Sequence, residues 1–370
     1  MKIKGYIKII LAISAALTLF AVNINAAESY DFGQNDIYSA LPPEAEQILD
    51  ELNATPSNGG ADINTENIFG VIWNTVRENV SKPLAMRASV IAVVILCSVT
   101  ESMHDSGNML SGTFGTVGVL ACSGIICTSF AAIMESSKTA IEALSAFLVV
   151  YIPSFAGIMA ASGETAAASA YNATITVATQ LISQLFSVII FPLSSCIMGI
   201  SIAGAINPDL KINSIAEAAK KLVNWALGLL MAVFTGLLSI QSFVAAAADS
   251  VSIRAIKFTV SGAVPIVGGA VSDALQTVKG SMTLLKSTTG SFGIIASVTV
   301  MLPVVQSVAL FRIALIVSSA ISDSFGTSRL TTLLKSGESV LAIVIAVMVC
   351  FWILAIVSTA IMLAISGGTA

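Results

Sequence analysis

Long apolar runs separated by short charged connectors dominate the chain from residue 83 onward. A membrane-spanning helix needs roughly 20 apolar residues, so each long stretch between consecutive charged residues marks a candidate span. The strongest, 106–134, has 29 uncharged residues, whereas 83–103 is weak because Arg87 and Glu101 enclose only 13. The predicted spans are 83–103, one within 106–134, 143–163, one or two within 165–208, 222–248, 287–311 with an apolar continuation over 313–322, and one within 339–367.

Two stretches of this pattern leave alternatives open. The run 165–208 has 44 uncharged residues and contains Pro192, which suits either one long kinked span or two short ones. The run 258–272 has only 15 uncharged residues and is interrupted by proline and paired glycines. It either crosses the membrane or re-enters without crossing, and we expect DALQTVKGSMTLLK after it to form an interfacial amphipathic helix capped by Asp273.

Composition supports a membrane protein. Of 370 residues, 56% are hydrophobic and 10% charged, and the mean hydropathy is +0.92, far outside the range of soluble domains. The fold class predicted is all-α, a polytopic membrane helix bundle of about 7–8 spans after a signal peptide. No basic patch is interleaved with aromatic residues, so no nucleic-acid partner is expected. The five cysteines lie in apolar runs and are predicted to be packing residues.

The N-terminal part divides into two further segments. Three lysines precede the apolar run 9–22, and small residues follow near Ala26, a pattern that predicts a signal peptide over 1–26, the alternative being an uncleaved first helix. Residues 27–82 form an acidic arm, predicted to be extracytoplasmic, with a helix at 43–52 and an amphipathic helix within 65–80. The transmembrane domain occupies 83–370.

A weak internal repeat is visible at an offset of 112 residues. The offset places IPSFAG over VPIVGG, with Pro153 on Pro265 and Gly157 on Gly269. It predicts repeat units 109–206 and 222–322, followed by the final span 339–367. Chance alignment of apolar sequences is the alternative. Short segments broken by proline and glycine at matching positions in two halves are typical of transporter sites.

The sequence lacks the usual catalytic constellations. His104 is the only histidine, and neither a zinc-protease motif nor a nucleotide-binding loop is present. We therefore expect no catalytic residue, metal or cofactor, and a protein that is not an enzyme. Ionisable residues in apolar territory are functional candidates because their burial is costly. Glu142, Asp273 and Arg312 fit that description, although Glu142 also suits a span boundary and Arg312 suits snorkelling to an interface.

One motif is more specific than the rest of the chain. The residues P-x-V-G-G-x-x-S-D-A run from Pro265 to Ala274, preceded by SIRAIKF. Together with the signal peptide, the acidic arm and the succession of spans, this motif resembles the stage III sporulation protein AE family, over about residue 40 to the end. The structural or functional candidates are Pro153, Gly157, Pro265, Gly268, Gly269, Ser272, Asp273 and Arg312.

The resemblance implies a non-enzymatic integral membrane subunit of the channel, or feeding tube, between mother cell and forespore. It implies a multi-pass location in the mother-cell membrane around the forespore, with the N-terminal arm extracytoplasmic. It also implies partners among the membrane and ring-forming proteins of that channel, a secretion-type ATPase and the lipid bilayer. The alternative from the repeat is a free-standing secondary transporter with inverted repeats and a site near Pro153 and Pro265.

Overall fold

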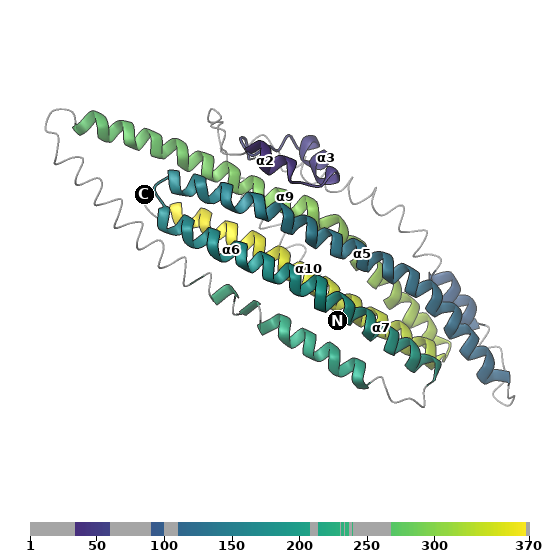
Figure 1. Cartoon of the computed structure of the whole chain (residues 1–370). Helices are drawn as coiled ribbons and strands as arrows, with labels where there is room; N and C mark the ends of the chain where they lie inside the picture. The colour runs from purple at the N-terminus through teal and green to yellow at the C-terminus, as the bar shows by residue number, and fades with distance from the viewer. Residues whose placement is uncertain are drawn as a thin grey trace.

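The structure is a computed structural model that describes residues 34–59, 90–99, 110–207, most of 214–239 and 268–367 (Figure 1). The signal peptide, the amphipathic helix at 65–80 and the segment around Pro265 lie outside these residues. Within them every regular element is a helix, which confirms the all-α class. Five described helices are long and apolar enough to cross a membrane, and Val90–Val99 is a shorter apolar helix.

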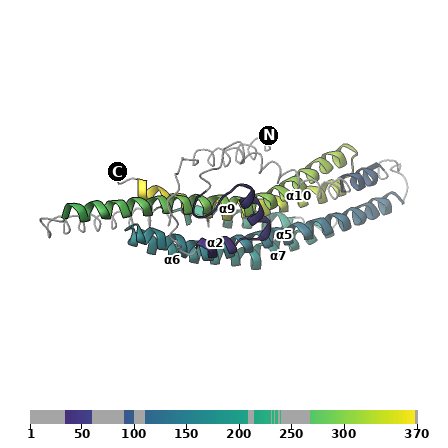
Figure 2. The same ribbon diagram turned by 90° about the horizontal axis from the view of Figure 1, so that it is seen from above.

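The central bundle consists of very long helices. α5 spans Leu110–Ala161 and has 52 residues, α9 spans Gly268–Ser324 and has 57, and α10 spans Ser328–Gly367 and has 40. At 1.5 Å per residue α5 is about 78 Å long and α9 about 86 Å. The two views show these helices lying along one common axis (Figures 1 and 2). The bundle is therefore more than twice as long as the roughly 30 Å hydrocarbon core of a membrane.

Two predicted spans are one helix in the structure. The sequence pattern predicts 106–134 and 143–163 as separate spans, but α5 continues through the charged residues between them. Glu135 and Glu142 point outward from the bundle, so their charges do not interrupt the helix. Since 240–267 and most of 83–103 are not described, the total of about 7–8 spans stays a prediction.

The run 165–208 forms one continuous helical rod. α6 spans Thr165–Leu185, a π-helical turn η1 spans Phe186–Ile190, and α7 spans Phe191–Ile206. In η1 the Phe191 N–H donates to the Phe186 carbonyl, which widens the turn directly before Pro192. Because proline lacks an N–H, a π-turn is a common way to pass it without breaking the rod. Of the two alternatives, the single long helix is the observed one.

Two tight turns connect the antiparallel helices. Between α5 and α6, the Glu164 N–H donates to the Met159 carbonyl and the Gly163 N–H to the Ala160 carbonyl, both at 3.0 Å. Gly163 has φ +91°, so these bonds form a Schellman turn, in which glycine is favoured. Gly326, with φ +75°, ends α9 in the same way. These turns place α6 beside α5 and α10 beside α9.

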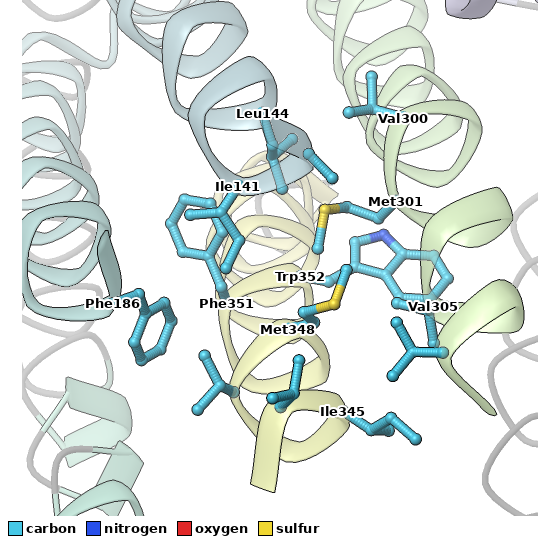
Figure 3. Packing of buried hydrophobic residues seen from close by; sticks show 14 of the residues in the cluster. Ile141, Leu144, Phe186, Val300, Met301, Val305, Ile345, Met348, Phe351 and Trp352 are labelled. Carbon is cyan, nitrogen blue, oxygen red and sulfur yellow. The ribbon is translucent and has the colours of Figure 1, made fainter. Parts of the chain in front are cut away.

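α10 lies at the centre of the bundle. Figure 3 shows Met348, Phe351 and Trp352 of α10 surrounded by side chains of α5, η1 and α9. Phe186 packs edge-on against Phe351 with ring centroids 6.2 Å apart. The core combines a large apolar cluster with many buried serines and threonines, so dispersion and the close packing that small residues allow hold the helices together.

The described part of the N-terminal arm, residues 34–59, packs on the outside of this bundle. α2 spans Gln34–Ser39 and α3 spans Pro43–Glu51, which confirms the helix expected at 43–52. The arm buries Ile37, Leu41, Ala45, Leu49, Leu52 and Ala54. α2 contacts α5 and α3 contacts α9, and both lie on the same side of the bundle (Figure 1).

Candidate functional site

The described part of the predicted broken segment, which starts at Gly268, lies far along the bundle from its repeat partner at Pro153. Pro153 is exposed within α5, and Gly157 is exposed, with open space within 4 Å of the position that a Cβ would take. Gly268 and Gly269 are the first residues of α9. Pro153 lies eight residues before the end of α5. Lys286 of α9 contacts Glu164, just after that end, and Gly268 lies 18 residues before Lys286. Pro153 and Gly268 are therefore roughly 40 Å apart along the bundle axis. The expected site near Pro153 and Pro265 stays a prediction, because Pro265 lies outside the described residues.

The expected interfacial helix is also different. α9 begins at Gly268 and continues without a break into the predicted span from residue 287. Ser272 and Asp273 therefore lie inside α9. Asp273 is the sixth residue of the helix and does not cap it, because an N-cap precedes the first helical turn. The start of α9 extends past the turn between α5 and α6 (Figure 1).

Several described elements meet instead at the segment KSTTGSFG, residues 286–293 of α9. Lys286 is 1% exposed, and its Nζ donates to Glu164 Oε2 at 2.5 Å. Glu164 follows the Schellman turn and its side chain is 11% exposed. The sequence pattern places Lys286 on the polar face of a surface helix. The structure shows that this assignment is wrong, because the turn between α5 and α6 covers the residue and supplies an acidic partner.

The same segment holds the N-terminal arm. The Thr289 hydroxyl donates to the Pro56 carbonyl at 3.5 Å. Gly59, with φ +56°, lies against the Thr288 backbone so closely that a Cβ would be 2.5 Å from the Thr288 carbonyl oxygen. The Tyr38 ring lies 6.2 Å from that of Phe292. The arm thus contacts α9 through backbone, hydroxyl and aromatic groups within one short stretch.

Small residues allow α5 and α10 to approach this segment from the other side. The Tyr151 ring of α5 occupies the space where Gly293 would have a side chain, with Cζ 2.3 Å from the Cβ position. The Tyr151 hydroxyl donates to the Thr289 carbonyl at 3.4 Å. Gly290 leaves room in the same way for Leu363 of α10. KSTTGSFG is therefore the point where arm, α5, α9 and α10 meet.

A hydrogen bond within the arm stabilises its docked form. The Tyr38 hydroxyl donates to the Asp50 carboxylate and to the Glu46 carbonyl, the latter at 3.3 Å. Burial, followed by the hydrogen bond and charge of Asp50, raises the pKa of Tyr38 well above its usual value. The phenol is therefore neutral at physiological pH and remains a donor. This bond joins α2 to α3.

A second ion pair joins α9 to α10, 26 residues further along α9 than Lys286. Arg312 Nη2 donates to Glu338 Oε1 of α10 at 3.0 Å, and the two side chains are 14% and 26% exposed. Snorkelling is the alternative that the sequence leaves for Arg312, and the structure gives it a carboxylate partner instead. Glu142 is 52% exposed and lies 3.8 Å from Lys138. Of the two ionisable candidates whose side chains the structure describes, Arg312 is in a largely buried pair and Glu142 is not.

Comparison with known proteins identifies the family. The family model described as stage III sporulation protein AE matches residues 47–366, which include part of the arm and all five long helices. The chain belongs to the stage III sporulation protein AE family. The stage III sporulation protein AE of Bacillus subtilis (strain 168) is 22% identical over 267 residues, covering 70% of this chain and 66% of that protein. The match thus spans just under two thirds of the curated relative's length.

No solved structure matches this chain. The family assignment confirms the expected sporulation membrane protein. It assigns no role to individual residues, so the roles of Pro265, Gly268, Gly269 and Ser272 stay predictions.

Proposed function

We propose that this protein is a non-enzymatic membrane subunit of the channel that joins the mother cell to the forespore. The observation that carries the proposal is the family match over residues 47–366, which extends across arm and bundle together. Membership of a stage III sporulation family gives a role in sporulation. A multi-pass helix bundle suits a component built into a membrane rather than a soluble factor.

We infer that the arm is extracytoplasmic, and its packing on the bundle at a defined place supports the proposal. It carries Asp36, Glu44, Glu46, Asp50 and Glu51, with no basic residue in 34–59. Because it is fixed to α5 and α9 around KSTTGSFG, a protein that binds the arm is held at a defined place on the bundle. We place the protein in the mother-cell membrane around the forespore, where ring-forming channel proteins and a secretion-type ATPase are its partners.

A genetic experiment in the native sporulating host tests this function. Deletion of the gene should let engulfment finish and then stop development, with spore yield restored by the full chain supplied in the mother cell. Restoration by expression only in the forespore would contradict the proposed location. Normal spore yield after deletion would contradict the proposed function itself.

A solute-transport assay separates the channel role from the transporter alternative. The purified protein, reconstituted alone in liposomes, should not accumulate or exchange solutes, because a channel subunit works only within its assembly. Transport by the isolated protein, driven by an ion gradient, would favour the inverted-repeat transporter.

A further inference from the structure

We propose that the membrane surrounds only one half of the bundle, and that the other half is a water-exposed stem that carries the arm. The membrane half contains residues 116–134 of α5, α7, the last part of α9 and the first part of α10. The stem contains residues 143–161 of α5, α6, the KSTTGSFG segment and the end of α10. This division concerns where lipid contacts the protein and does not depend on the channel role.

Two belts of charged residues enclose the membrane half. At one end, Arg329 Nη1 donates to Thr116 Oγ1 at 3.2 Å, and Lys335 lies 3.7 Å from Asp323. From Thr116 to Glu135 is 19 residues, about 29 Å along a helix, close to the hydrocarbon thickness of a bilayer. The two ends of this half are thus both charged and separated by one bilayer. The Arg312–Glu338 pair lies between these ends but faces largely into the bundle, with side chains only 14% and 26% exposed.

The second belt is continuous across two helices. Glu135, Lys138 and Glu142 share one outward face of α5, because they are spaced by three and four residues. The Ser187 hydroxyl of η1 donates to Glu142 Oε1 at 3.5 Å, so the belt continues onto the rod formed by α6 and α7. Lys138 and Glu142 are 41% and 52% exposed, and exposed charges of this kind belong at a membrane surface rather than in its centre.

The two halves also differ in what α6 and α7 expose. On the stem side the rod exposes Thr165, Ser169, Ala173, Val177, Gln180, Leu181 and Gln184. Beyond the belt it exposes Val188, Ile189, Pro192, Ser195, Cys196, Gly199 and Ala203. The amide side chains end at Gln184, directly before the belt. From there to the end of α7, the outward face has no charge and no amide group.

The position of the arm indicates which half of the bundle contacts lipid. Residues 143–163 are also uncharged and long enough for a bilayer, so spacing alone allows either half. The arm, however, packs on that second half through Tyr38 with Phe292 and Pro56 with Thr289. Of its five acidic residues, four are exposed and Glu46 is half-buried, and 34–59 contain no basic residue. Acidic side chains facing hydrocarbon are strongly unfavourable, so the half that carries the arm lies in water.

Cysteine labelling tests the proposal on the purified protein in lipid nanodiscs, where both sides are open to solvent and no partner is present. In a background that keeps native Cys196 and replaces the other four cysteines with alanine, Cys196 reports on the membrane half. With Cys196 also replaced, Leu120→Cys reports on the same half, and Val177→Cys and Leu181→Cys report on the stem. The substituted side chains are comparably exposed, at 50%, 57% and 65%.

A water-soluble maleimide should react at Val177→Cys and Leu181→Cys about tenfold faster than at Cys196 and Leu120→Cys, because the reactive thiolate forms only in contact with water. All four sites should react alike after denaturation in SDS. Equal rates at all four sites in nanodiscs, or faster labelling at Cys196 and Leu120→Cys, would overturn the proposal.

Nitroxide spin labels at the same four positions give a second measurement that separates lipid contact from burial. Collisions with a water-soluble nickel chelate should dominate at residues 177 and 181, and collisions with oxygen at residues 120 and 196. Oxygen dominance at residues 177 and 181 would place the stem in lipid and refute the assignment.

Discussion

The buried pair of Lys286 and Glu164 makes a quantitative prediction about stability. Replacing Glu164 with Gln keeps the shape of the side chain but removes the carboxylate that accepts from Lys286 at 2.5 Å. Lys286 is only 1% exposed, so its ammonium group would lose its acidic partner in a site that water reaches poorly. Breaking a buried pair in this way costs roughly 3–5 kcal/mol, and we expect the lower end because Glu164 is 11% exposed.

Thermal unfolding of the purified protein in detergent measures this loss. The double variant Lys286→Met, Glu164→Gln should recover most of the stability lost in Glu164→Gln, because it leaves no buried charge. Lys335→Met is the matched control: its partner Asp323 lies 3.7 Å away and the two side chains are 57% and 66% exposed, so the change should be below about 1 kcal/mol. Equal effects of Glu164→Gln and Lys335→Met would refute the reasoning.

Two further variants test the arm contact and the second ion pair. Gly59→Ala places a Cβ 2.5 Å from the Thr288 carbonyl oxygen at a backbone φ of +56°. It should lower the free energy of unfolding by about 1–3 kcal/mol and speed hydrogen exchange in α3, whereas the control Gly157→Ala should change neither. Unchanged hydrogen exchange in Gly59→Ala would count against docking of the arm. Arg312→Gln should lower the free energy of unfolding by about 3 kcal/mol, because Glu338 loses its guanidinium partner. Adding Glu338→Gln to this variant should restore most of the lost stability. An Arg312→Gln variant as stable as the native protein would contradict a structural role for the pair.

The helical class and most helix positions could be predicted because apolar runs of this length have no other stable form in a membrane. Where one helix continues through a charged or proline-containing stretch could not be predicted from the sequence. Charged residues at 135, 138 and 142 suggest a connector within α5, but charges on an outward face do not stop a helix. Pro192 similarly allows one helix or two, since only the backbone shows whether a π-turn relieves the missing hydrogen bond.

The ion pairs were missed for a different reason. Glu164 and Lys286 are 122 residues apart, and each lies at the border of an apolar run, where a charge usually contacts water or headgroups. Their burial results from the tight turn at Gly163 and from the arm covering α9, which no local pattern reveals. A usable signal was present in the small residues of KSTTGSFG, because several glycines, serines and threonines in succession permit close helix contacts.

Blue-native electrophoresis of membranes from sporulating cells tests the proposed channel role most directly. We expect the protein to migrate in a large complex that contains the secretion-type ATPase and the ring-forming channel proteins, and this complex to be lost when those partners are deleted. Migration only as a monomer or homodimer, in cells that complete sporulation, would contradict that role.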